Sequence, residues 1–350
     1  MTSPDQRSLQ RELDRFAEDG LRRAAGHGED YRELWRALAR ATASGKRIRP
    51  ALMLAAYEAF GGRDGAVATR VAAALELLHT ALLAHDDVID GDLVRRGAAN
   101  VSGTFVERAA ARGADASGQA VFGLAAGVLA GDLALVAATR QLALCGADAA
   151  TTRRLLDLLD DALHVSAAGE LADVALSIGG TPEVGVLGDV ITMEERKTAV
   201  YSFQLPLQAG AVLAGAPEAT VERLGEVGRL AGIGFQLFDD VLGVFGDESR
   251  TGKSALGDLR EGKMTPLLVH ARSTELWPTI APYVGDRTLD EERAGLVRAM
   301  LVECGSRAFV ERLADSYVSA ALAAVDGLDL DPSLLAELST LTERLMGSAA

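Results

Sequence analysis

Apolar residues recur every three or four positions along most of the chain, which is the spacing of one face of an α-helix. Near the N-terminus, Leu9, Leu13, Phe16 and Leu21 fall near one face of a predicted helix over residues 6–25. The same periodicity predicts helices over residues 29–43, 51–60, 120–144, 147–178, 221–245, 264–273, 289–304, 306–325 and 332–346, and one that starts near Asp64. The pattern contains no ladder of strands, internal repeat or long linker. It therefore predicts an all-α fold in one large domain, residues 1–350, with residues 1–28 as a helical extension.

Glycine and proline divide these segments. Pro50 suits the first turn of a helix, and Gly61-Gly62 is an expected stop. Pro206 predicts a break or kink within a helical region. Residues 98–118 are ambiguous between a loop and a short helix, and residues 246–261 read as a polar loop.

Composition narrows the class of protein. Hydrophobic residues make up 49% and aromatic residues only 5%, which favours helix over sheet. A net charge of −15 argues against a nucleic-acid partner. Cys145 and Cys304 are too few for a disulfide framework or a zinc site. The charged N-terminus is unlike a signal peptide, and the most apolar stretch, Gln119 to Gly131, is too short to span a bilayer. We therefore expect a soluble, cytoplasmic protein without a transmembrane segment.

The stretch from Glu76 to Gly97 carries the first candidate chemistry. Its apolar helical face runs into Asp86 and Asp90, which point the same way because they are four residues apart. Asp87 and Asp92 add to the crowding of acids, which the negative end of a helix dipole disfavours. Such oxygen ligands suit Mg²⁺ shared with a substrate phosphate. The alternative is a solvated acidic helix end followed by a basic loop.

A second acidic pair, Asp239 and Asp240, lies within an apolar helical stretch. Carboxylates are costly there unless they are paired or bind metal, although a chance pair remains the alternative. Two such clusters on separate long helices indicate a helical bundle around a central cavity, with metal at its mouth.

Basic residues that could meet phosphate are scattered along the chain. They are Lys46, Arg47, Arg49, Arg95, Arg96, Lys197, Lys253 and Lys263. Taken singly, each reads as a surface residue. The segment Thr251–Ser254, TGKS, does not fit a nucleotide-binding P-loop, because the glycine spacing is wrong and a helix precedes it.

Five motifs occur in one order: GKRIRP, LLHTALLAHDDVIDGDLVRRG, GELAD, RKTAVYSF and GFQLFDDVLGVFGDESRTGKSALGDLREGK. Together they cover most of Gly45 to Lys263, and in them the chain resembles the trans-isoprenyl diphosphate synthases of the polyprenyl synthetase family. The resemblance implies an isoprenoid synthase fold, a homodimer and a Mg²⁺-dependent prenyltransferase. Such an enzyme joins isopentenyl diphosphate head-to-tail to an allylic diphosphate (dimethylallyl, geranyl or farnesyl), giving an all-trans prenyl diphosphate.

The resemblance also assigns roles to residues. It implies metal ligands at Asp86, Asp90 and Asp239; contacts to isopentenyl diphosphate from Lys46, Arg49, His79 and Arg96; contacts to the allylic diphosphate from Arg95, Lys197 and Lys253; and, beside Lys197 in the catalytic group, oxygens near the carbocation from Thr198 and Gln236. Gly243 stands where many relatives have a third aspartate, which puts Asp240 and Asp247 in doubt as ligands. His79 reads alternatively as a buried core histidine.

Product length and two rival classes stay open. Relatives that stop at farnesyl carry a bulky aromatic four or five residues before the first aspartate, where this chain has Leu82 and Ala81, with Leu78 one turn earlier. The resemblance therefore implies geranylgeranyl diphosphate, with farnesyl or longer products as alternatives. A class I terpene cyclase would lack a second diphosphate site. An inactive regulatory subunit would typically have lost more of the acidic or basic residues.

Overall fold

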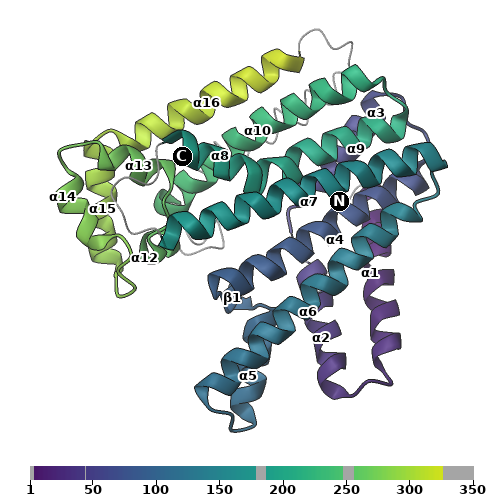
Figure 1. Ribbon diagram of the computed structural model, residues 1–350, viewed down its shortest axis with the longest axis horizontal. Coiled ribbons are helices and arrows are strands. Elements are labelled where there is room, and N and C mark those ends of the chain that lie inside the picture. Colours follow the sequence, from purple (N-terminus) through teal and green to yellow (C-terminus); the bar gives the residue numbers. More distant parts are fainter. Residues whose placement is uncertain (1–3, 44, 179–186, 247–255, 326–350) are drawn as a thin grey trace. The chain divides into compact units, whose positions relative to one another are not determined.

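The structure, a computed structural model, describes residues 4–43, 45–178, 187–246 and 256–325. These residues are almost entirely helical (Figure 1), so the all-α prediction is confirmed. The chain forms two compact units, which we describe separately. Unit 1 is Met1–Leu159 with Ala209–Ala216, and unit 2 is Asp160–Gln208 with Pro217–Ala350. The single domain over residues 1–350 stays a prediction.

Unit 1 is built around one long helix. Its elements are α1 (Pro4–Ala24), α2 (Glu29–Ala43), α3 (Ile48–Ala59), α4 (Gly65–Asp90), β1 (Val94–Arg95), β2 (Ala98–Ala99), α5 (Val101–Ala111), α6 (Ala116–Ala143), the start of α7 (Ala149–Ile178) and the end of α9 (Leu205–Ala214). Helix α4 packs against α1, α3 and α6. Asp64 fixes where it begins, because its side chain accepts hydrogen bonds from the backbone N–H groups of Ala66 and Val67.

The N-terminal helix α1 belongs to the core of unit 1. Leu9 and Leu13 are buried, and the helix packs against α2 and α4. A second part of the core lies where α4 meets α2 and α6, with Ala81 on α4, Trp35 on α2, and Ala130 on α6. Small residues there allow the helix backbones to pack closely, which holds α4 firmly in place.

A short hairpin follows α4, which the sequence did not predict. Val94 pairs with Ala99 and Arg95 with Ala98 in an antiparallel register. The two residues between the strands, Arg96 and Gly97, have φ of 55° and 75°. Positive φ at both central residues is typical of a type I′ turn, whose twist matches that of a hairpin. Of the ambiguous stretch 98–118, the structure places 98–99 in this hairpin and 101–111 in α5.

Unit 2 is centred on α10. Its elements are the rest of α7, α8 (Leu187–Glu194), the π-helix η1 (Glu195–Gln204), the start of α9, α10 (Glu218–Phe245), α12 (Gly257–Glu261), α13 (Pro266–Arg272), α14 (Trp277–Ile280), the 3₁₀-helix η2 (Ala281–Tyr283), α15 (Glu291–Glu303) and α16 (Ser306–Val325). Helix α10 packs against η1 and α16. Ile233, Leu237 and Val241 of α10 are fully buried in this core, together with Val310 and Ala314 of α16.

The predicted kink at Pro206 takes another form. Pro206 is the second residue of α9, and the irregular element is the π-helix that comes directly before it. The backbone of η1 lies very close to α10, because a Cβ added at Gly232 would be 2.5 Å from Cβ of Ala199. Of the predicted loop 246–261, the last residues form α12. The helix predicted over residues 332–346 lies outside the described residues.

Within the part of the chain that the structure describes, two helices are long and apolar enough to cross a membrane by length and composition alone. Helix α4 is one, but 72% of its apolar window is buried inside the protein. Helix α6 is the other, and only 33% of its window is buried. The prediction that the stretch ending at Gly131 is too short for a membrane span is wrong, because α6 continues through Asp132 to Ala143.

Candidate active site

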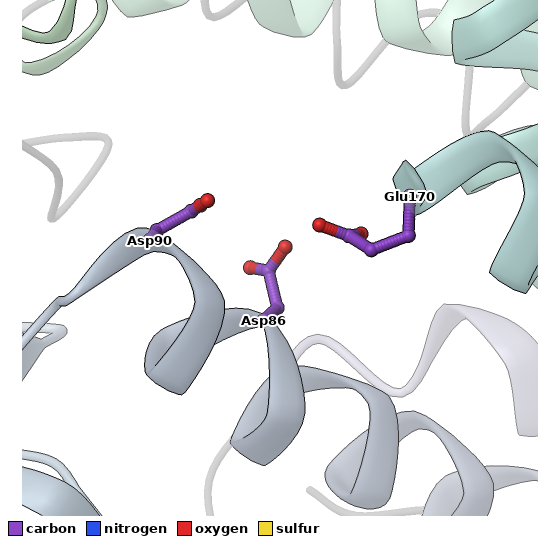
Figure 2. Close-up of side chains that lie close together, drawn as sticks. All are labelled: Asp86, Asp90 and Glu170. Atoms are coloured by element: carbon purple, nitrogen blue, oxygen red, sulfur yellow. The ribbon is translucent and has the colours of Figure 1, made fainter. Parts of the chain in front are cut away.

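The last two turns of α4 present the first acidic pair. Asp86 is half-buried and Asp90 is exposed. Figure 2 shows both carboxylates projecting from the same side of the helix, and an oxygen of one lies within 4.8 Å of an oxygen of the other. Both charges lie at the negative end of the α4 dipole, so a cation between them would relieve their repulsion. Glu170, the third carboxylate labelled in Figure 2, lies on the part of α7 in unit 2 and is described with that unit.

Arg95 connects the hairpin to these acids. Its Nη2 lies 3.1 Å from Oδ2 of Asp86, and its Nε donates to Oδ1 of Asp87 at 2.6 Å. Burial raises the pKa of Asp87 to about 6, while the hydrogen bond from Arg95 acts in the opposite direction. Arg95 therefore stands beside the acidic pair with its guanidinium among the carboxylates, where it also suits a phosphate oxygen.

A second group of basic side chains surrounds His79. Burial, and then the charges of Arg49, Arg96, Arg95 and Arg47, hold the pKa of His79 well below its ordinary value. The imidazole is thus neutral and can donate one N–H to an anion. The alternative that His79 is an ordinary core histidine does not account for the positive charges of the arginines that act on it. Lys46 is exposed in the turn before α3.

Lys197 is held in unit 2 by two acids of the GELAD motif. Its Nζ lies 2.6 Å from Oδ2 of Asp173 and 3.1 Å from an oxygen of Glu170. Helices α7 and η1 are in close contact here, because a Cβ added at Gly169 would be 2.3 Å from the backbone N of Lys197. The GELAD motif is visible in the sequence, but no role was predicted for Glu170 or Asp173. Their spacing of three residues on one helix face was the available signal.

The second acidic motif lies in the last turns of α10. Asp239 is half-buried, Asp240 is buried, and Gln236 donates to Oδ1 of Asp240 at 2.9 Å. The charge of Asp240 acts on the buried Glu194 of α8. Burial raises the pKa of Asp240 to about 6, and burial together with the charge of Asp240 raises the pKa of Glu194 well above its usual range. Glu194 was not among the site residues predicted from the sequence.

Asp258 fills the space beside Gly243. A Cβ added at Gly243 would lie 2.2 Å from Oδ2 of Asp258, a carboxylate of α12. Its charge also contributes to the raised pKa of Asp240. The acid that is absent from position 243 therefore has a counterpart fifteen residues later in the chain.

Some of the remaining predicted residues lie in the described part of the chain, and others lie outside it. Thr198 is half-buried in η1 directly after Lys197. Of the product-length residues, Ala81 and Leu78 are buried and Leu82 is half-buried. Lys253 and Asp247 lie outside the described residues.

Comparisons with known proteins agree with this arrangement. The family model "Polyprenyl synthetase" matches residues 32–293. A geranylgeranyl diphosphate synthase of Methanosarcina mazei is 33% identical over 79% of this chain and 78% of its own length. A geranylfarnesyl diphosphate synthase of Aeropyrum pernix is 33% identical over 87% and 89%.

Among solved structures, a geranylgeranyl pyrophosphate synthase from Corynebacterium glutamicum, complexed with isoprenyl diphosphate and magnesium, is 30% identical. It superposes with a TM-score of 0.88 and covers 96% of each chain. The family match spans both acidic motifs and the basic residues grouped around His79. The chain therefore belongs to the polyprenyl synthetase family and is an isoprenyl diphosphate synthase, a prenyltransferase.

Proposed function

We propose that the protein condenses isopentenyl diphosphate with an allylic diphosphate and releases all-trans geranylgeranyl diphosphate. The observation that carries this proposal is that unit 1 holds two different charged groups. One is the carboxylate pair Asp86 and Asp90 with Arg95, which suits a diphosphate bridged by a cation, and the other is the arginine group around His79, which suits a diphosphate directly. A terpene cyclase handles a single diphosphate and has no use for the second group.

Magnesium fits the first group. Asp86 and Asp90 offer hard oxygen ligands at adjacent turns of one helix face. The family resemblance implies a further metal ligand at Asp239, which lies on α10. Bound Mg²⁺ supplies positive charge that stabilises the diphosphate as it departs from the allylic carbon. Of the acidic residues of both motifs, only the third aspartate of the second motif is missing, at Gly243. The alternative of an inactive regulatory subunit, which would typically have lost more, therefore has little support.

The chain's own residues share the remaining work. Arg95, Lys197 and Lys253 bind the allylic diphosphate, whereas Lys46, Arg49, His79 and Arg96 bind isopentenyl diphosphate. The oxygens of Thr198 and Gln236 face the allylic cation as oriented dipoles. The double bond of isopentenyl diphosphate attacks that cation, and the released diphosphate accepts the proton then lost. No protein nucleophile takes part.

Radiolabelled isopentenyl diphosphate, supplied with each allylic primer and Mg²⁺, tests the proposal directly. Chromatography of the dephosphorylated products should give labelled geranylgeraniol as the main alcohol. A cyclic hydrocarbon made from the primer alone would support the cyclase instead. No product from any primer would favour the regulatory subunit.

Product length is the finer part of the proposal. Relatives of equal identity to this chain are named for geranylgeranyl and geranylfarnesyl products, so overall similarity does not decide between them. The support for geranylgeranyl is local: the positions five and four residues before Asp86 hold Ala81 and Leu82, neither of which is aromatic. Small side chains leave room for a tail longer than farnesyl.

Ala81→Phe is expected to shorten the main product by at least one five-carbon unit, because a ring would occupy the tail's path. Ala81 is fully buried, so the ring also strains the core by about 1–3 kcal/mol. Ala56→Phe, at an equally buried alanine of α3, is the control for strain alone. Product chromatography and melting temperature are measured for both variants. An active Ala81→Phe enzyme with unchanged products would remove Ala81 from the elongation pocket.

The homodimer is proposed to form through α6. Val121, Leu124, Val128 and Val136 lie along one stripe of this helix, and each is exposed. The exposed Asp132 interrupts the stripe between Val128 and Val136. Exposed apolar residues gathered on one face mark a site that a partner covers. A second copy of this chain is the occupant that the family resemblance implies. The cytoplasmic location is likewise a proposal.

Leu124→Glu is expected to convert the dimer into a monomer, because a charge would have to be buried in the interface. Light scattering coupled to size exclusion gives the mass of each species. Val302→Glu on α15, another exposed apolar residue, is the matched control and should remain dimeric. A monomeric wild type, or wild type that sediments with lipid vesicles, would contradict the proposal.

A further inference from the structure

Glu76 is a carboxylate buried in an apolar part of α4. It is only 3% exposed, and its neighbours Leu75 and Leu77 are buried as well. Burying a charge is unfavourable unless a partner compensates for it. Glu76 has none of the metal-binding or substrate-binding roles assigned above, so its burial in this position needs another explanation.

Its partner is Arg47, the middle residue of the basic run before α3. Nη1 of Arg47 lies 2.6 Å from Oε1 of Glu76. Nη2 of the same guanidinium donates to the carbonyl oxygen of Thr42 at 2.7 Å and reaches Oε1 of Gln10 at 3.5 Å. Groups on α1, α2 and α4 thus hold Arg47 from three directions, and its donors are used inside the protein.

The backbone of Arg47 explains why such an anchor is needed. Its φ is 55° and its ψ is 36°, the left-handed conformation that residues with a side chain rarely adopt. This residue sits directly before α3 and sets the angle between the turn with Lys46 and the helix with Arg49. A strained residue keeps its conformation only where its surroundings hold it. The contacts to Glu76 and Thr42 supply that hold.

Glu76 also lies beside Arg96. A Cβ added at Gly45 would be 3.3 Å from Oε1 of Glu76 and 3.5 Å from Nη1 of Arg96, so both groups border the same point of the backbone. Burial and the charge of Arg95 lower the pKa of Arg96, and the charge of Glu76 acts in the opposite direction. Glu76 therefore acts on two arginines of the group around His79, Arg47 and Arg96.

We propose that Glu76 is a positioning residue for the isopentenyl diphosphate pocket. It fixes Arg47 as an internal anchor rather than a substrate ligand, and it thereby presents Lys46 and Arg49 on one side and Arg96 on the other. This inference rests on the proposed function, because it assumes that these three residues bind that diphosphate.

Glu76→Ala tests the inference through the two substrates. The affinity for isopentenyl diphosphate, measured by calorimetry and as KM, should fall by about tenfold or more, because the guanidinium positions lose a charge-assisted hydrogen bond. The KM for the allylic primer and kcat at saturation should not change. Glu76→Gln keeps an oxygen acceptor at the same place, so it should show a smaller loss; it also serves if the alanine variant fails to fold.

Arg47→Met should reproduce the Glu76→Ala result, and the double variant should be no weaker than the worse single one, since both act through one contact. Asp64→Ala is the matched control. It removes the cap of the same helix and should lower the melting temperature without changing the affinity for isopentenyl diphosphate.

Two outcomes separate the failure of this inference from that of the proposed function. If wild type binds isopentenyl diphosphate and Glu76→Ala binds it equally well or more tightly, Glu76 is not a positioning residue, and the proposed function stands. If wild type does not bind isopentenyl diphosphate at all, the proposed function fails, and the inference fails with it.

Discussion

Asp86→Asn is expected to reduce kcat by about a thousandfold while leaving the helical circular-dichroism signal unchanged. The amide has nearly the same shape as the carboxylate but no charge, so the pair with Asp90 loses half of its attraction for a divalent cation. Arg95 contacts the half-buried Asp86 side chain at 3.1 Å, and an amide oxygen can still accept that bond. The loss should therefore fall on the chemistry rather than on folding. The fall in kcat is measured as turnover at saturating substrates across a Mg²⁺ titration.

Asp92→Asn is the matched control for this experiment. Asp92 lies in the same acidic stretch but two residues beyond the end of the helix, outside the pair that shares a face. Its loss should leave kcat near the wild-type value. Asp239→Asn, in the other unit, should resemble Asp86→Asn. Near-normal turnover of Asp86→Asn at every Mg²⁺ concentration would remove Asp86 from the metal site.

Helix positions were the most predictable part of the fold. The bounds of α2 and α16 agree with the predicted ranges, those of α7 and α10 differ from them by a few residues at most, and α4 starts one residue after the predicted Asp64. These helices carry strong apolar periodicity between clear stops, and helical periodicity is a property of the local sequence. Long helices with one buried face could therefore be predicted without knowing what covers that face.

Two local features could not be predicted in this way. The hairpin after α4 has strands of only two residues, too short to show an alternating pattern. The π-helix η1 differs from an α-helix by its hydrogen-bond register, which packing against α10 determines. Both features carry site residues, Arg95 and Lys197. Irregular backbone at a functional site is common, since it aims side chains that a regular helix would direct elsewhere.

The same distinction between local sequence and tertiary packing applies to the residues of the site. Motif order was enough to predict roles for Asp86, Asp90, Asp239 and Lys197, and these roles stay predictions. It could not find their partners, because pairing depends on which helices meet. Glu194 beside Asp240 is one example, and Asp258 beside Gly243 is another. A single sequence contains these acids but does not show that they are neighbours.

Lys197→Ala is expected to raise the KM for the allylic primer by about ten- to a hundredfold, the cost of one charge-assisted contact. Its KM for isopentenyl diphosphate should change little. Arg49→Ala should have the opposite pattern, because Arg49 belongs to the group around His79. Steady-state kinetics, with each substrate varied at saturation of the other, separates the two effects. Lys46→Ala should follow Arg49→Ala.

The acids around Lys197 make a conservative variant necessary. Removing its ammonium leaves Asp173, which is buried, without the cation 2.6 Å away, so Lys197→Ala also loses stability. Lys197→Arg keeps the charge beside Asp173 and Glu170 but replaces a compact ammonium by a planar fork. It should restore the melting temperature while recovering only part of the affinity for the allylic primer. Full recovery of both would mean that Lys197 supports the fold and not the diphosphate. Equal effects of Lys197→Ala and Arg49→Ala on both substrates would contradict the division into two diphosphate sites.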